Sequence, residues 1–381
     1  MEQVKGFRDV SGKEALKREE IKKILVGTFK LYGFEPAETP IIENEEFVKA
    51  GNLGQEAISD IFRLQDKGKR NLALRYEFTF QLKRLANNKK LPYKRYQIGE
   101  VFRDEPVSSN RFRQFVQCDA DIVGAGIRDE AEILCIAGKI LENLGIKAEI
   151  CINNRKLLNE IMEKEGIIEK EAVLREIDKI DKIPEKDIKE NLKKFRADKL
   201  VELFKNPESY FKKFSSYKEI EELKKYCLYY NIGVKFKPNL SRGLGYYNGS
   251  IFEIKTKEMK ETIIAGGSYT VNNIQATGIS FGLDRISSIA NISARDRRII
   301  IVSIAQDKEA VKIAESLRKK NVDVIVMYKI TNALEYANSL DIPYVIFVGE
   351  KEAKEKKFKL RDMKTGKENM LSEIGIIKAL T

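Results

Sequence analysis

Residues 111–123 read RFRQFVQCDADIV, and this stretch decides what kind of fold the chain adopts. In a β-strand, successive side chains point to opposite faces of the sheet. The even-numbered positions, which are largely apolar, are Phe112, Gln114, Val116, Cys118, Ala120 and Ile122. The odd-numbered positions are Arg111, Arg113, Phe115, Gln117, Asp119, Asp121 and Val123. The pattern predicts a strand with one buried face and one face that gathers cations, an amide and carboxylates.

The preceding stretch KRYQIGEVFRD, residues 94–104, alternates in the same way, and EPVSSN joins the two. This arrangement predicts an antiparallel hairpin. The residues that its arms place on one side are Arg103, Arg113, Gln117 and Asp121. An ordinary half-exposed sheet with polar side chains facing water shows the same alternation. The other interpretation is a site for a zwitterionic, phosphate-bearing ligand, because an arginine fork fits phosphate and a carboxylate fits an ammonium group.

Two further stretches carry candidate binding residues. In NLALRYEFT, residues 71–79, Arg75, Glu77 and Thr79 alternate on one side of a predicted strand, which a solvated strand face also explains. In LSRGLGYYNGSIFE, residues 240–253, two glycines lead into Tyr246 and Tyr247. Glycine permits a close backbone approach to a ligand and tyrosine supplies an apolar wall with a polar end, although a simple Gly/Tyr-rich turn fits as well.

A fourth stretch, IIAGGSYT followed by ATGISFGLDRI, spans residues 263–286. Its small residues 265–267 predict a patch of sheet surface left open to a flat ligand. Arg285 falls in the first turn of a predicted helix, where a cation is unfavourable unless an anion lies near it. A surface arginine is the alternative.

The rest of the chain predicts an α+β fold with two domains. An antiparallel sheet domain is expected in two parts, residues 1–154 and 232–290. Between them, residues 155–231 are highly charged with apolar side chains at helical spacing, which predicts a helical insertion. Residues 297–381 alternate strand and helix as βαβαβ, typical of a small α/β domain with a largely parallel sheet. A capping box of Ser11 and Glu14 is expected to open the first helix.

Composition excludes several kinds of chemistry. The 381 residues contain no histidine, so an imidazole base, an imidazole zinc ligand and a Ser–His–Asp triad are all excluded. The four cysteines are scattered without CxxC spacing, which predicts neither disulfides nor a metal site and suits a reducing cytoplasm. No apolar run approaches the length that spans a membrane. A net charge of +12 makes a polyanionic partner plausible.

Taken in order, these stretches resemble the histidyl-tRNA synthetases, a family of class II aminoacyl-tRNA synthetases. The resemblance is carried by KGFRDV, ETPIIE with Pro40, LALRYEFT, KRYQIGEVFRDE with RFRQFVQCDADIVG, RGLGYYNG, IAGGSY and GISFGLDRI. RGLxYY is the feature most specific to this family. The C-terminal part, with GEKEAKEKKFKLRDMKTG, resembles the family's anticodon-binding domain. The implied fold is a class II catalytic domain with a helical insertion and a C-terminal α/β anticodon-binding domain.

The resemblance also implies roles for individual residues. Arg103 and Arg242 would be catalytic and would grip the α-phosphate of ATP from two sides, Arg111 and Arg113 would lie near its adenine or pyrophosphate end, and Arg285 would bind the γ-phosphate. The residues implied to hold histidine are Glu77, Thr79 and Gln117 at its ammonium group, Asp121 and Tyr246 at its imidazole, and Tyr247 as a wall of the pocket.

The activity implied is the formation of histidyl-adenylate from L-histidine and ATP with Mg²⁺, then transfer to the 3′ end of histidine tRNA. A homodimer formed through the stretch around Pro40 is implied as well. The chain departs from the family at Gly245 and Thr270, where Asp is usual, and at Ser268, where Arg is usual. These departures leave room for a non-catalytic relative that senses histidine and partners an ATP phosphoribosyltransferase, although that relative lacks the anticodon domain.

Overall fold

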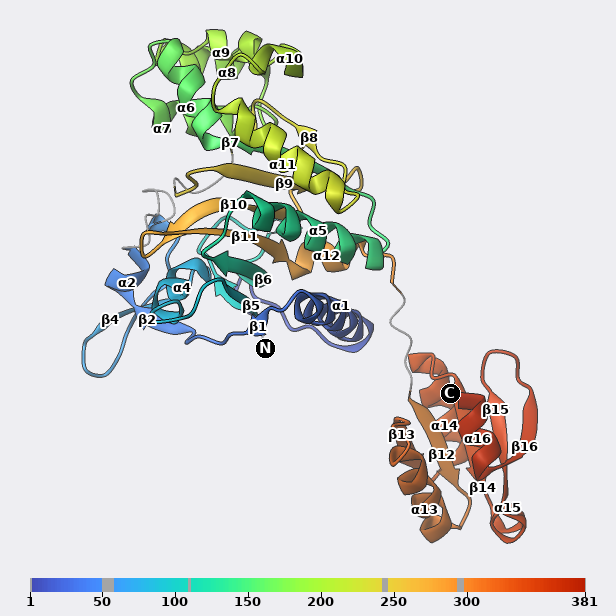
Figure 1. The fold of residues 1–381 in the computed structure, drawn as a ribbon. Coiled ribbons are helices and arrows are strands. Elements are labelled where there is room, and N and C mark those ends of the chain that lie inside the picture. Colours follow the sequence, from blue (N-terminus) through green and yellow to red (C-terminus); the bar gives the residue numbers. More distant parts are fainter. Residues whose placement is uncertain (1, 50–57, 109–110, 242–245, 293–297, 381) are drawn as a thin grey trace. The chain divides into compact units, whose positions relative to one another are not determined.

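The computed structural model describes residues 2–49, 58–108, 111–241, 246–292 and 298–380. It divides into two compact units, Met1–Ile292 and Ser293–Thr381 (Figure 1). The first unit is built on an eight-stranded sheet. Its strand order is β1 (Glu35–Pro36), β5 (Tyr93–Phe102), β6 (Gln114–Val123), β11 (Ile274–Gly282), β10 (Ile264–Val271), β9 (Ser250–Lys255), β7 (Glu149–Asn154) and β8 (Lys235–Phe236). Only the two short edge strands, β1 and β8, pair in parallel with their neighbours, so the core of the sheet is antiparallel as predicted.

The predicted hairpin is formed by β5 and β6, with Gly99 opposite Gln117 and Arg95 opposite Asp121. Its second strand begins at Gln114 and not at Arg111, because Arg111 and the two residues after it belong to the connection between the strands. The even-numbered face of β6 is buried in the main hydrophobic core, as its apolar side chains predict. The helices whose side chains join that core over the sheet are α1 (Gly12–Leu31), α5 (Ile127–Asn143) and α12 (Leu283–Ile289).

The first helix begins after Ser11 as expected, but the predicted capping box is wrong. The Ser11 side chain makes no capping hydrogen bond, and Glu14 forms an ion pair of 2.8 Å with Arg8 instead. The helix is therefore tied at its start to the preceding loop through Arg8.

A second, three-stranded sheet flanks the large one. It contains β2 (Ile42–Asn44), β4 (Asn71–Leu74) and β3 (Arg63–Gln65), with the helices α2 (Glu45–Lys49) and α4 (Thr79–Leu85) beside it. The strand predicted to run through NLALRYEFT ends at Leu74, so Arg75, Glu77 and Thr79 do not alternate along one strand. Arg75 donates instead to the carbonyls of Thr39 and Glu100, at 2.8 and 2.6 Å, and so ties this segment to β5.

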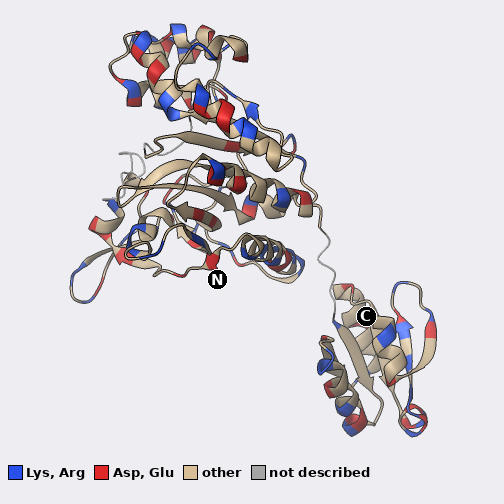
Figure 2. Ribbon diagram, viewed as in Figure 1, with Lys and Arg blue, Asp and Glu red and all other residues tan. Residues whose placement is uncertain are grey.

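The region predicted as a helical insertion contains six helices. They are α6 (Arg155–Lys164), α7 (Lys170–Ile177), α8 (Glu185–Lys193), α9 (Lys199–Leu203), α10 (Glu208–Phe211) and α11 (Tyr217–Tyr229). Basic and acidic side chains are interspersed over these helices (Figure 2). Their buried side chains belong to the same hydrophobic core as the large sheet, so the helices pack onto the sheet domain and do not form a core of their own.

The second unit has the predicted βαβαβ arrangement followed by a hairpin. Its strands β12 (Ile299–Ser303), β13 (Val324–Met327) and β14 (Tyr344–Val348) are parallel, and α13 (Asp307–Arg318) and α14 (Ile330–Leu340) connect them. After α15 (Glu350–Glu355), the antiparallel strands β15 (Lys357–Asp362) and β16 (Glu368–Ser372) extend the sheet before α16 (Glu373–Leu380). In the described part of the chain, no helix is both long and apolar enough to span a membrane.

Candidate active site

The odd-numbered face of the hairpin is buried and does not face water. The exposed fraction is 0% for Arg95, 2% for Gln97, 6% for Gln117, and 4% for both Asp119 and Asp121. Burying ionised or amide groups is costly unless they are paired or bind a ligand. The interpretation of this face as an ordinary solvated sheet surface is therefore wrong.

Arg103 lies just beyond the end of β5, at the open end of this polar face. Its Nη2 atom is 3.4 Å from Gln117 Oε1, and its Nε atom donates to the carbonyl of Tyr76 at 3.3 Å. The guanidinium carbon lies 4.4 Å from the centre of the Tyr76 ring and 5.2 Å from that of Phe115. Two aromatic rings thus hold the guanidinium in place, and the sequence prediction that Arg103 and Gln117 share a side is confirmed.

Asp121 lies deeper on the same face and contacts two residues that the sequence analysis did not single out. Arg95 Nη2 lies 2.9 Å from Asp121 Oδ2, which makes the two side chains an ion pair. The two groups are not aligned for a hydrogen bond. Tyr269 donates its hydroxyl to Asp121 Oδ1. Arg95 could have been found from the sequence, because the hairpin register places it directly opposite Asp121.

Two further carboxyl groups, Glu77 and Asp119, are buried and incompletely bonded. Glu77 Oε1 and Asp119 Oδ1 accept no hydrogen bond, while Asp119 Oδ2 accepts one of 2.9 Å from Gln117 Nε2. Burial raises the pKa of Glu77 to about 8, and burial together with the nearby Asp121 raises that of Asp119 to about 7. Oxygen atoms that are buried without a partner suit a ligand that donates hydrogen bonds.

The two tyrosines of the RGLGYY stretch cover part of the same face. Their ring centres are 4.8 Å apart, and the Tyr246 ring lies 5.6 Å from that of Tyr269. A Cβ atom on Gly267 would lie 2.9 Å from the Tyr247 ring. The prediction that residues 265–267 leave the sheet uncovered is therefore wrong at Gly267, since the glycine admits the Tyr247 ring. Burial raises the pKa of both phenols, so they remain protonated donors.

Arg111 and Arg113 lie in the connection between β5 and β6, where acidic residues of the same connection bind them. Arg111 Nε is 3.2 Å from Glu105, and Arg113 Nη2 is 2.9 Å from Asp104. Gly6, in the KGFRDV stretch, accepts a hydrogen bond of 2.9 Å from the Arg113 backbone, and a Cβ on Gly6 would lie 2.8 Å from the Arg113 side chain. The N-terminal segment therefore packs directly on Arg113.

Arg285 occupies the first turn of α12, as predicted, and donates to the carbonyl of Thr262 at 2.9 Å. The neighbouring Asp284 accepts from Val116 of β6 at 3.1 Å, which fixes the helix start to the hairpin. A cavity of about 380 Å³ adjoins Arg285, and the charged and aromatic residues of its walls also include Arg8, Lys13, Glu14, Lys17, Phe112 and Asp284. Arg242 lies outside the described residues.

Ser268, one of the departures from the family pattern, faces a buried carboxylate. Ser268 and Ser250 donate to the two oxygens of Glu130, a residue of α5, and the second of these hydrogen bonds is 2.6 Å long. Burial raises the pKa of Glu130, whereas the two serine hydroxyls lower it. The two serine hydroxyls therefore satisfy both oxygens of Glu130, although the resemblance implies an arginine in place of Ser268.

Known protein families match this chain over nearly its whole length. The model of the family described as histidyl-tRNA synthetase matches residues 6–286, and the model described as anticodon binding domain matches residues 296–381. "Histidine--tRNA ligase 1" of Bacillus cereus (strain ATCC 10987 / NRS 248) is 35% identical over 413 residues, covering 97% of this chain and 94% of the relative. "Histidine--tRNA ligase" of Clostridium acetobutylicum is 31% identical over 417 residues, covering 96% of each.

Solved structures show the same fold. Histidyl-tRNA synthetase from Nostoc sp. PCC 7120 has a TM-score of 0.87 at 23% identity and covers 100% of this chain and 98% of its own. A Bacillus halodurans protein described as an ATP phosphoribosyltransferase regulatory subunit/histidyl-tRNA synthetase has a TM-score of 0.75 at 19% identity, covering 88% of this chain and 96% of its own. The predicted α+β catalytic domain with a C-terminal α/β anticodon-binding domain is confirmed. This chain belongs to the histidyl-tRNA synthetase family.

Proposed function

We propose that the protein activates L-histidine with ATP and transfers the histidyl group to the 3′ end of histidine tRNA. The observation that carries this proposal is the position of Arg103 beside Gln117 of the buried face, together with an unpartnered oxygen of Asp119 on that face and one of Glu77, which covers it. A cation close to carboxyl groups matches a ligand that carries both a phosphate and an ammonium group.

The first step needs no proton-abstracting side chain. The carboxylate of histidine attacks the α-phosphorus of ATP, its oxygen forms the new P–O bond, and pyrophosphate leaves with the electrons of the broken bond. Catalysis then consists of alignment and of neutralising the charge that develops on the phosphate oxygens. This chemistry suits a chain without histidine.

The amino acid would lie over the buried carboxyl groups. Glu77, Thr79 and Gln117 are proposed to bind its ammonium group, and Asp121 and Tyr246 its imidazole, with Tyr247 as a wall. Asp119 joins this set because its Oδ1 atom has no partner in the free protein. An incoming ammonium or imidazole N–H would supply the hydrogen bond that these oxygens lack.

ATP would lie along the arginines. Arg103 and Arg242 are proposed to face the α-phosphate, Arg111 and Arg113 the adenine or pyrophosphate end, and Arg285 the γ-phosphate. The basic cavity beside Arg285 has the volume and charge for a phosphorylated ligand. Within the described ranges, no three acidic or cysteine side chains come together as a metal site. Magnesium would therefore arrive as Mg·ATP, held chiefly by the phosphates of the substrate.

The C-terminal unit is proposed to contact the anticodon of histidine tRNA, with residues 1–154 and 232–290 forming the catalytic domain and 155–231 its insertion. Residues 297–381 contain 17 Lys and Arg against 12 Asp and Glu, a net charge of +5, which favours contact with phosphates. A homodimer formed around Pro40 and a cytoplasmic location are part of the same proposal.

A second candidate is the histidine-sensing regulator. Ser268 favours it, because replacing an arginine by a serine removes a charge from the site while Glu130 stays satisfied. The match to the anticodon-binding domain favours the synthetase instead, because the regulator is expected to lack that domain.

Histidine-dependent exchange of pyrophosphate into ATP tests the proposal. We expect exchange by the wild-type protein, its collapse in Arg103→Ala and Arg242→Ala, and charging of histidine tRNA. Binding of histidine without any exchange would establish the regulator in its place.

A further inference from the structure

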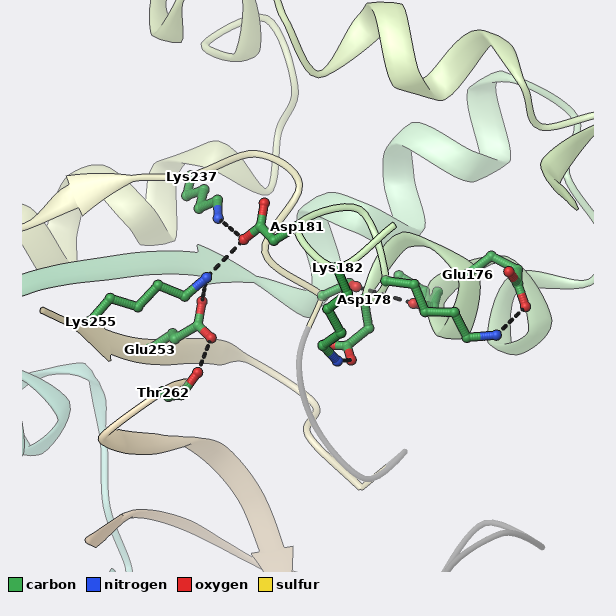
Figure 3. A network of polar contacts seen from close by, with 11 residues as sticks. Glu176, Asp178, Asp181, Lys182, Lys237, Glu253, Lys255 and Thr262 are labelled. Carbon is green, nitrogen blue, oxygen red and sulfur yellow. Dashed lines mark hydrogen bonds and ion pairs between the residues drawn. The ribbon is translucent and has the colours of Figure 1, made fainter. Parts of the chain in front are cut away.

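The turn between α7 and α8 makes direct contact with the end of β9 and with the residue that follows β8 (Figure 3). Asp181 in this turn accepts a hydrogen bond of 2.5 Å from Lys237, just after β8, and one of 2.7 Å from Lys255, at the end of β9. Burial alone would raise the pKa of Asp181, but the two lysines lower it overall. One carboxylate of the helical region is thus shared by two cations of the sheet.

One branch of contacts leads from Asp181 to Arg285. Lys255 also lies 3.3 Å from Glu253, whose side chain is only 3% exposed. The other oxygen of Glu253 accepts from the Thr262 hydroxyl at 2.5 Å, and the Thr262 carbonyl accepts from Arg285 Nη1 at 2.9 Å. Four successive contacts therefore join the α7–α8 turn to the arginine proposed to bind the γ-phosphate.

The other branch leads to the segment before Arg242. Lys237 begins this segment, and Asn153 of β7 donates to the carbonyls of Pro238 and Leu240 at 3.0 and 2.9 Å. Ser241 donates to the carbonyl of Leu174, in α7, at 3.1 Å and is buried. The residue that follows Ser241 in the sequence is Arg242, so α7 fixes the backbone directly before it.

These contacts are packed together and do not enclose a ligand pocket. The cavity among them has a volume of only about 30 Å³, which is room for water and not for a substrate. Because hydrogen-bonded ion pairs hold their partners at fixed separations, a shift of the turn must move Lys237 and Lys255 or break their bonds to Asp181.

We propose that Asp181 is a positioning residue through which the helical region sets the affinity of the site for ATP. This inference rests on the proposed function of Arg285 and Arg242. Asp181 does not touch the substrate; it holds Lys255, from which the contacts to Arg285 begin, and Lys237, which begins the segment before Arg242. A movement of the helical region would then change ATP binding with little effect on histidine binding.

The test compares Asp181→Asn with Asp178→Asn in the full-length protein. Asp178 belongs to the same turn but pairs with Lys182 of that turn, at 2.7 Å. Substitutions along such a network change coupling by about 2- to 30-fold. In pyrophosphate exchange, we expect Asp181→Asn to raise the KM for ATP by about that factor and to leave the KM for histidine unchanged. Asp178→Asn should match the wild type. Asp181→Glu should have a KM for ATP between those of the wild type and Asp181→Asn.

Equal KM values for ATP in the two asparagine variants would overturn the inference. A rise in the KM for histidine as large as that for ATP would also overturn it. Titration calorimetry with Mg·ATP separates this result from a failure of the proposed function. If the wild-type protein binds Mg·ATP but shows no exchange, the proposed synthetase activity is refuted. Weaker binding of Mg·ATP by Asp181→Asn than by Asp178→Asn would then still support the coupling between the helical region and the ATP site. Wild-type protein that binds no Mg·ATP would overturn both.

Discussion

Arg95 and Asp121 form an ion pair on the β5–β6 hairpin of the large sheet, with 2.9 Å between Arg95 Nη2 and Asp121 Oδ2. Both side chains project from directly opposed positions of β5 and β6. Arg95 is completely buried, and its Nη2 atom also donates to the carbonyl of Phe78 at 3.2 Å. The pair therefore fixes the floor on which the proposed histidine pocket lies.

The first prediction concerns the stability of this pair. Removing one partner of a buried ion pair leaves an uncompensated charge and costs about 3–5 kcal/mol. We expect Arg95→Met to lower the free energy of unfolding by that amount and Arg95→Met with Asp121→Leu to recover part of it, both measured by urea denaturation. A double variant that is less stable than Arg95→Met would contradict the assignment.

The second prediction concerns catalysis by Arg103. Loss of one preorganised donor to a developing negative charge typically reduces turnover by about 10²–10³-fold. Arg103→Ala should reduce histidine-dependent exchange by this factor while the unfolding midpoint changes little, because the side chain is only half-buried. Arg111→Ala is the matched comparison, since its side chain is 53% exposed and pairs with Glu105. We expect a smaller loss there, and equal losses would count against the special role of Arg103.

The third prediction is a pH dependence of stability from Glu77. In the unfolded chain its carboxyl group loses a proton near the ordinary pKa of 4.5, whereas burial raises the folded pKa to about 8. Between these values the folded state holds a proton that the unfolded state lacks. The contribution of Glu77 to stability should therefore be full below pH 4.5 and fall as pH rises towards 8, by up to about 1.4 kcal/mol per pH unit.

Asp119 should contribute in the same direction between its ordinary pKa of 3.8 and about 7. Denaturation of the ligand-free protein at pH 5, 6, 7 and 8 measures the slope, and Glu77→Gln should flatten it. An unchanged slope in that variant would show that Glu77 is ionised in the folded protein at neutral pH.

Period-two alternation was enough to predict the hairpin, its buried apolar face and the shared side of Arg103 and Gln117. It could not predict that the polar face is buried as well, because the covering residues Glu77, Tyr246 and Tyr247 come from segments distant in the sequence. The role of Asp119 depends on which of its oxygens remains unpaired, and that follows only from three-dimensional contacts. The end of β4 at Leu74 could not be predicted for a related reason, since the next residue, Arg75, donates to two carbonyls of other segments.

The last prediction uses the close approach of two strands at Gly278, which lies opposite Asp121 in β6. A Cβ atom there would lie 2.0 Å from Asp121 Oδ1 and 3.1 Å from the carbonyl oxygen of Ala120, so the carboxylate must move. Gly278→Ala should therefore break the hydrogen bond from Tyr269, lower the free energy of unfolding and raise the KM for histidine more than that for ATP.

Gly138→Ala is the matched control, because Gly138 lies within α5 with nothing within 4 Å of an added Cβ. Replacing a helical glycine by alanine should stabilise the protein by about 1 kcal/mol and leave both KM values unchanged. If Gly278→Ala behaved like this control, Asp121 would be free to shift without consequence. The pocket floor would then not depend on the fixed position of its carboxylate.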